Sequence, residues 1–178
     1  MIRTFIAVEL PERLKPEIKK ICSMLKIPGI KLVEPELVHI TMKFLGDVRE
    51  DQVEQIAAAL MKINTRQFEA NIKGIGVFPK PAYVKVIWLG AQGNFNPLHD
   101  EIERVLSPFK FEKEGHFTPH ATLARVKELR DKAELFEKIK QLEGVDLGTI
   151  NVGSICLKKS TLTPEGPIYE TLHEIKLN

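Results

Sequence analysis

The 178-residue sequence predicts an α+β fold with an approximate internal duplication. Segments with the two-residue alternation of strands are interleaved with segments that repeat apolar residues at helical spacing. A four-residue pattern of His, apolar, Thr, apolar occurs twice, at His39–Met42 and His120–Leu123. Each copy lies in a predicted strand that a predicted helix follows. We therefore expect two related halves within a single domain that spans residues 1–178.

The first half of the chain is expected to form two strands, two helices and a hairpin. Ile2–Leu10 is rich in β-forming residues and predicts the first strand. Pro11 suits a first helical turn, and apolar residues then recur at helical spacing to about Lys26. The following segments predict a strand, a helix and a two-stranded hairpin, over Val38–Leu45, Glu50–Ile63, Phe68–Phe78 and Tyr83–Gly90.

The second half of the chain contains a similar order of elements. We expect a helix, the second motif strand, another helix and two closing strands, over Phe95–Leu106, Phe117–Ala124, Leu129–Leu142, Ile150–Lys158 and Ile168–Lys176. The segment Ser160–Pro167 carries two prolines and a glycine, so it is expected to be a loop.

Charge and cysteine content limit the classes of function. The chain has 26 basic and 24 acidic residues, and this net charge of +2 argues against a long nucleic-acid track. A few cations gathered around one phosphate are compatible with it. Cys22 and Cys156 lack metal-site or redox spacing and are expected to be reduced thiols. No signal-peptide pattern and no apolar run of roughly 20 residues occurs, so we expect no membrane partner and a cytoplasmic location.

The repeated motif suits acid–base chemistry at a phosphodiester. Because side chains alternate along a strand, His39 and Thr41 share one face, and so do His120 and Thr122. If the two strands lie close together, one neutral imidazole can accept a proton from an attacking water while the other donates one to the leaving oxygen. The threonine hydroxyls can donate to non-bridging phosphate oxygens. These four residues are the predicted catalytic set.

Two other interpretations of the histidines remain open. A lone His often fills a satisfied polar niche, but two copies in equivalent contexts favour a shared site. A zinc site needs at least three His, Cys or carboxylate ligands, and the remaining histidines, His99, His116 and His173, show no ligand-like spacing to either motif. We therefore expect no metal and no cofactor.

The chain resembles the two-histidine phosphoesterase superfamily, in particular the archaeal and bacterial RNA 2',3'-cyclic phosphodiesterases, also called 2'-5' RNA ligases. The resemblance runs nearly end to end and is carried by the segments Arg3–Pro11, His39–Gly46, Phe117–Arg125 and Ser160–Tyr169. Met42 stands where Leu is usual in the family, which is a swap of similar volume.

The resemblance implies a bilobal fold, with an antiparallel sheet and flanking helices in each lobe and the active-site cleft between them. It also implies hydrolysis of a 2',3'-cyclic phosphate to a 2'-phosphomonoester, with His39 as proton donor to O3' and His120 as the base for water. The reverse reaction with a 5'-hydroxyl would join RNA through a 2'-5' link. The expected partners are RNA ends or oligoribonucleotides with a cyclic phosphate, such as tRNA halves, and nothing in the sequence demands more than a monomer.

Two charged residues beside the motifs are predicted to bind the phosphate. Lys43 shares the expected strand face of His39 and Thr41, although a solvated lysine at the rim is the alternative. Arg125 follows the second motif and can fork onto phosphate oxygens. Strict alternation puts Arg125 on the core face, so it reaches the cleft only if the strand ends or twists there. The resemblance favours contact with phosphate.

Aromatic residues are candidates to stack on a base, as in many complexes with single-stranded RNA. We predict Phe5 and Tyr169 for this role, and Tyr83 and Trp88 are further candidates. Packing in the core is the alternative for each of them, and especially for Trp88.

Three hypotheses for function follow. The first is metal-free hydrolysis of RNA 2',3'-cyclic phosphate ends. The second is hydrolysis of small cyclic nucleotides or 2'-5' oligonucleotides by the same residues. The third is an RNA-end-binding module without turnover, which a bell-shaped pH–rate profile would exclude, since catalysis by a histidine pair requires one protonated and one neutral ring.

Overall fold

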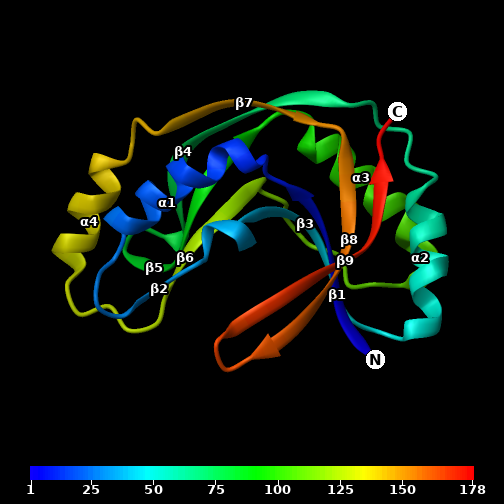
Figure 1. The fold of residues 1–178 in the computed structure, drawn as a ribbon, viewed down its shortest axis with the longest axis horizontal. Coiled ribbons are helices and arrows are strands. Elements are labelled where there is room, and N and C mark those ends of the chain that lie inside the picture. Colours follow the sequence, from blue (N-terminus) through cyan, green and yellow to red (C-terminus); the bar gives the residue numbers. More distant parts are fainter.

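The computed structural model describes all 178 residues. They form four α-helices and nine strands of one sheet, joined by loops and short 3₁₀ turns (Figure 1). The helices are α1 Lys15–Met24, α2 Val53–Leu60, α3 Phe95–Leu106 and α4 Lys132–Gln141. The strands are β1 Ile2–Glu9, β2 Ile30–Leu32, β3 His39–Val48, β4 Phe68–Lys80, β5 Tyr83–Gln92, β6 His120–Val126, β7 Asp146–Val152, β8 Ser154–Thr163 and β9 Gly166–Lys176. The predicted α+β class is confirmed.

The sheet consists of two four-stranded halves that meet at the two motif strands. Its order is β7-β4-β5-β6-β3-β1-β8-β9, every pairing is antiparallel, and the short strand β2 pairs with β6. Strands β3 and β6 are joined by the single pair Ile40 and Ala121. The expectation of one sheet per lobe is therefore corrected: one curled sheet runs through both halves, and the join at β3 and β6 marks the division between them.

Each half of the sheet is covered by a helix that follows a strand of the other half. Helix α1 follows β1 in the chain but packs on β6, whereas α3 follows β5 and packs on β3. In Figure 1, α1 and α4 lie over one half of the sheet, at the left, and α2 and α3 lie over the other half, at the right. This exchange ties the halves together. No helix is long and apolar enough to cross a membrane.

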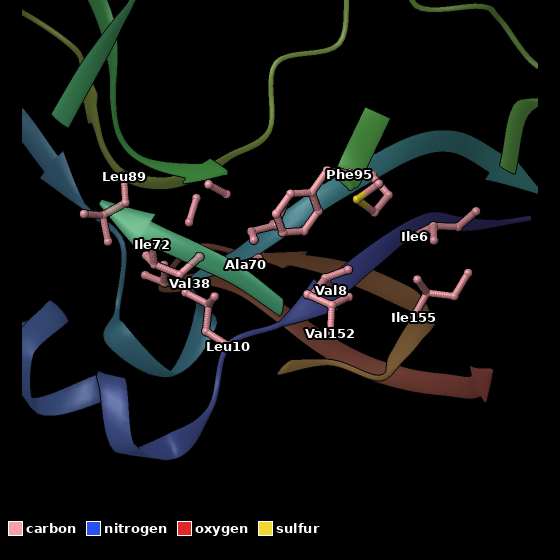
Figure 2. Close-up of a cluster of buried hydrophobic side chains, with 14 of the residues drawn as sticks. Ile6, Val8, Leu10, Val38, Ala70, Ile72, Leu89, Phe95, Val152 and Ile155 are labelled. Carbon is pink, nitrogen blue, oxygen red and sulfur yellow. The ribbon is translucent and has the colours of Figure 1, made fainter. Parts of the chain in front are cut away.

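One continuous core links the two halves. The buried apolar side chains form a single cluster of 44 residues. Figure 2 shows part of it, with Val8 of β1, Ile72 of β4, Phe95 of α3 and Val152 of β7 among the labelled side chains. Of these, Ile72 and Phe95 are fully buried. Burying a large apolar side chain contributes roughly 1.5–3 kcal/mol, so both halves are stabilised by the same packing.

Three of the differences between the expected and the observed boundaries have a local reason. Strand β6 begins at His120 and not at Phe117, because Pro119 has no N–H to donate to a neighbouring strand. The predicted strand Ile150–Lys158 is instead parts of β7 and β8, which separate at Gly153 and pair with different halves. The predicted loop Ser160–Pro167 is the end of a β8–β9 hairpin that turns at residues 164 and 165.

Candidate active site

The single pair between β3 and β6 puts both motifs on one face of the sheet. Partners in an antiparallel pair point to the same face, and Ile40 and Ala121 both point into the core, where they are 0% and 1% exposed. The residues that flank them therefore share the opposite face: His39, Thr41, His120 and Thr122. All four line a cleft of about 780 Å³. The predicted convergence of the two motifs is confirmed.

A β-bulge at the last residue of each motif interrupts the alternation of both strands. In β3, Ile6 and Ala7 of β1 pair with Lys43 and Thr41, which leaves Met42 as the extra residue. In β6, Ile87 and Trp88 of β5 pair with Ala124 and Thr122, which leaves Leu123 as the extra residue. A bulge shifts the side chains that follow it to the other face, up to the next irregularity, which in β3 lies at Leu45. The two motifs therefore share their backbone irregularity as well as their sequence.

The bulge in β3 overturns the predicted position of Lys43. Lys43 is 1% exposed and points to the core side, whereas Phe44 faces the cleft with 56% of its surface exposed. The ammonium of Lys43 donates to Oε1 of Glu103 at 2.5 Å and to the carbonyl of Glu112 at 2.7 Å. The prediction that Lys43 shares the face of His39 is wrong, and its charge is already paired within the fold.

The bulge in β6 has the opposite consequence for Arg125. Strict alternation would bury this residue, but the extra Leu123 turns Arg125 toward the cleft, which it lines as an exposed side chain. Arg3, Lys31 and Lys127 line the same cleft. Arg125 is thus placed where a guanidinium can reach an anionic group held between the histidines.

The two imidazoles are oriented by the same backbone contact. Nδ1 of His39 donates to the carbonyl of Leu37 at 2.7 Å, and Nδ1 of His120 donates to the carbonyl of Thr118 at 2.6 Å. Because a carbonyl only accepts, Nδ1 carries the proton in each neutral ring, and Nε2 is the nitrogen free for proton transfer. Nε2 of His39 lies 3.0 Å from Oγ1 of Thr41.

Aromatic rings hold each imidazole from the side. The Phe5 ring stacks on His39 at 5.0 Å, and Tyr169 meets His39 edge-on at 5.4 Å. On the other half, Phe78 meets His120 edge-on at 4.9 Å, and the centroid of Trp88 lies 5.8 Å away. These contacts fix the ring planes and remove water from one side of each ring.

Burial lowers the pKa of both imidazoles below the ordinary value of 6.5. The backbone carbonyls act in the other direction, since an accepting oxygen stabilises the protonated ring. The strongest charged neighbour differs between the two rings: Glu9 favours the protonated form of His39, whereas Arg125 favours the neutral form of His120. Near neutral pH both rings of the free protein are mainly neutral, so a nearby anion is needed to hold one of them protonated.

The buried Lys43 connects the first motif strand to the segment that precedes the second motif. Its partner Glu112 begins that segment, which carries the Thr118 carbonyl against His120. The other partner, Glu103, lies 3.7 Å from Nε2 of His99, whose ring stacks on Phe117 at 4.3 Å. This cluster fastens the segment that orients His120.

A match to a known family model covers the chain in two segments, residues 8–88 and 90–169, with one His-Thr motif in each. The model describes LigT-like phosphoesterases. The chain belongs to this family.

Several curated relatives of this LigT-like phosphoesterase are named RNA 2',3'-cyclic phosphodiesterase. The Methanocaldococcus jannaschii protein is 41% identical, and the alignment covers 97% of this chain and 99% of the relative. The Methanothermobacter thermautotrophicus protein is 37% identical, with 99% of each chain covered.

Solved structures share the fold of this LigT-like phosphoesterase. A crystal structure from Thermus thermophilus superposes with a TM-score of 0.85 at 26% identity, covering 99% of this chain and 98% of that one. Escherichia coli LigT complexed with 3'-AMP superposes with a TM-score of 0.82 at 19% identity, with the same coverage. The second likeness concerns the fold alone.

The predicted base-stacking residues of this family member fall into two groups. Phe5 is 3% exposed and packs between His39 and Tyr169, so the prediction that it stacks on a base is corrected: its ring supports a histidine. Tyr169 is half-buried and lines the cleft, and burial raises the pKa of its hydroxyl. Its stacking on a base stays a prediction.

Sequence reasoning missed two aromatic residues of the cleft. Strict alternation in Val38–Leu45 predicts Phe44 on the core face with Ile40, because the bulge at Met42 has no signal in a single sequence. Phe78 was placed only as the end of a strand, although it contacts the His120 ring. No group of three or more His, Cys, Asp or Glu side chains is placed to hold a metal ion.

Proposed function

We propose that this LigT-like phosphoesterase hydrolyses the 2',3'-cyclic phosphate ends of RNA to 2'-phosphomonoesters. One observation carries the proposal: His39 and His120 line one cleft, and in each neutral ring a backbone carbonyl holds Nδ1–H, so Nε2 is the nitrogen that can accept a proton, with Oγ1 of Thr41 3.0 Å from Nε2 of His39. The names of the curated relatives support the substrate class.

The reaction needs two proton transfers around one phosphorus. Nε2 of His120, as the base, takes a proton from water while the water oxygen bonds to phosphorus. The bond from phosphorus to O3' breaks, and protonated His39 delivers its proton to O3'. The charge neighbours support this assignment, because Glu9 favours the protonated form of His39 and Arg125 favours neutral His120.

Other groups of the cleft stabilise the negative charge. The hydroxyls of Thr41 and Thr122 and the guanidinium of Arg125 donate to the non-bridging phosphate oxygens, where charge builds in the transition state. The anionic phosphate in turn raises the pKa of His39, which offsets the effect of burial on that ring. The exposed ring of Phe44 and the ring of Tyr169 offer surfaces for the terminal base.

The test is incubation with an oligoribonucleotide that ends in a 2',3'-cyclic phosphate, followed by identification of the product phosphate. We expect a 2'-phosphomonoester. A 3'-phosphomonoester would overturn the assignment of the leaving oxygen, and tight binding without turnover would leave the chain as an RNA-end-binding module. Hydrolysis of small cyclic nucleotides or 2'-5' oligonucleotides alone would favour the second hypothesis.

Several finer expectations stay predictions. Run in reverse, with a 5'-hydroxyl in place of water, the same two histidines would form a 2'-5' linkage. The physiological substrates that we expect are RNA ends with a cyclic phosphate, tRNA halves among them. We also expect this protein to be a monomer and to act on these ends in the cytoplasm. Sedimentation of the purified chain and localisation of a tagged copy test the last two expectations.

A further inference from the structure

A second cavity lies outside the catalytic cleft, on the half of the sheet that contains β4 and β5. It has a volume of about 770 Å³ and runs between the β4–β5 hairpin and helix α4. In Figure 1, α4 lies at the outer end of this half. We call this cavity the α4 groove. Nothing in the mechanism above uses it.

The α4 groove concentrates positive charge. Five lysines and two glutamates line it: Lys80, Lys85, Lys127, Lys132, Lys140, Glu137 and Glu143. The local excess of cations is larger than the net charge of +2 of the whole chain. A surface of this kind attracts a polyanion of a few charges.

Two exposed aromatic rings stand on opposite walls of the groove. Tyr83 of the hairpin is 54% exposed and Phe136 of α4 is 50% exposed. The ammonium of Lys85 lies 4.7 Å from the centroid of the Tyr83 ring. Rings interleaved with lysines match the alternation of bases and phosphates along single-stranded RNA. A protein partner is less favoured, since the cores of protein interfaces are depleted of lysine.

The α4 groove borders the catalytic cleft at one side chain. Lys127 lines both cavities. Trp88 also lines the groove, and its ring centroid lies 5.8 Å from that of His120. The indole covers Gly76, where a Cβ would come within 2.1 Å of the Trp88 ring, so this approach of Trp88 to the neighbouring strand requires glycine. A chain that leaves the cleft beside His120 therefore meets the groove next.

We propose that the α4 groove binds the nucleotides that lie 5' of the cyclic-phosphate nucleotide, as single-stranded RNA. The inference rests on the proposed function, because a cyclic phosphate held between His39 and His120 is the 3' end, and all remaining nucleotides lie on its 5' side. Their bases stack on Tyr83 and Phe136, and their phosphates pair with the lysines. The low net charge limits the site to a few nucleotides.

The experiment compares substrates of different length. We measure kcat/KM for 2',3'-cyclic AMP and for oligoribonucleotides of about two, four and eight residues that end in a cyclic phosphate. The wild-type value should rise with length and then level off. Phe136→Ala and Lys132→Glu should lower kcat/KM for the octamer about tenfold, through KM, since a stacked base contributes about 1–3 kcal/mol. Both variants should hydrolyse 2',3'-cyclic AMP at the wild-type rate.

Matched controls lie on the other half of the molecule. Met61 and Lys62 are exposed just beyond the end of α2, so Met61→Ala and Lys62→Glu make the same kinds of change away from the groove. They should leave kcat/KM unchanged for every substrate. Equal wild-type kcat/KM for the mononucleotide and the octamer would overturn the proposal, and so would an octamer defect in the control variants that matches the defect in the groove variants.

A binding measurement separates this inference from the proposed function. Fluorescence anisotropy reports the affinity for a labelled octaribonucleotide with a 3'-terminal phosphate, without any turnover. Weaker binding by Phe136→Ala than by Met61→Ala supports RNA binding in the α4 groove even if no cyclic phosphate is hydrolysed. Absence of hydrolysis would contradict the proposed function and leave the binding inference standing. Equal affinity of the two variants overturns the groove.

Discussion

Phe44 and Arg125 occupy equivalent positions, five residues after the histidine of each motif, and both face the catalytic cleft. Each is turned there by a bulged residue, Met42 or Leu123. The duplicated strands thus present an apolar ring from one half and a guanidinium from the other. These two groups complement the two parts of a nucleotide, because a ring can stack on the flat base and a guanidinium can pair with the anionic phosphate. The cleft therefore has a base-binding side and a phosphate-binding side.

Each motif histidine should be indispensable for turnover. His39→Ala or His120→Ala removes one of the two proton transfers, so each should lower kcat by about 10²- to 10⁴-fold. The matched control is His173→Ala, because His173 pairs with Glu54 on the surface at 2.9 Å and lies outside the cleft. Initial rates on an RNA 2',3'-cyclic phosphate, with thermal unfolding as the check on folding, decide the matter. Full activity in either motif variant contradicts the mechanism.

The pH dependence of kcat/KM should be a bell with its optimum below pH 6.5. Burial lowers the pKa of both histidines from 6.5 in the free protein, and a ring with a lowered pKa is neutral above that value. Activity falls at acid pH as the base is protonated, and at higher pH as the acid loses its proton. At saturating substrate the bound phosphate anion should move the alkaline limb of kcat to higher pH. An optimum of kcat/KM above about pH 7.5 would be incompatible with these shifts.

Arg125 should act on the phosphate and on His120. Arg125→Ala should lower kcat/KM by about 10- to 100-fold, because a hydrogen bond to a charged group contributes about 1.5–3 kcal/mol. Removing the cation should also raise the pKa of His120, which NMR titration of the imidazole would report. Arg130→Ala is the control, since Arg130 is exposed beyond the same strand. Unchanged kinetics and an unchanged His120 titration in Arg125→Ala would remove this residue from the site.

Lys43 should contribute to stability and not to phosphate binding. Lys43→Met leaves Glu103 without its partner in a mostly buried place, which should cost about 2–4 kcal/mol in the free energy of unfolding. The double variant with Glu103→Gln should recover part of this loss. Urea unfolding measures both, and Lys62→Met, exposed just beyond α2, should change little. If Lys43→Met kept full stability but raised KM, the lysine would contact substrate after all.

Chelation tests the expected independence from metal. Dialysis against EDTA should leave kcat unchanged, because the proposed steps use only imidazole, hydroxyl and guanidinium groups. Readdition of Zn²⁺ or Mg²⁺ should then give no increase. A large loss of kcat that either ion reverses would favour a metal site at the histidines instead.

The sequence by itself determined the local pattern of the site. The alternation in Val38–Leu45 put His39 and Thr41 on one face, because successive side chains of a strand point to opposite faces and residues two apart share a face. Its repetition at His120 and Thr122 predicted a second strand of the same kind. The helix Phe95–Leu106 was also predictable in full, because its apolar residues recur at helical spacing.

Only the tertiary structure decided what lies beside the motifs. The bulges at Met42 and Leu123 depend on the hydrogen-bond register of β3 with β1 and of β6 with β5. In each pair the two strands are far apart in the sequence. Because of these bulges, Lys43 is buried and Arg125 faces the cleft. The pair Ile40 and Ala121, 81 positions apart, joined the two motifs into one cleft. Such long-range pairings are set by packing across the whole sheet, and no local spacing of residues encodes them.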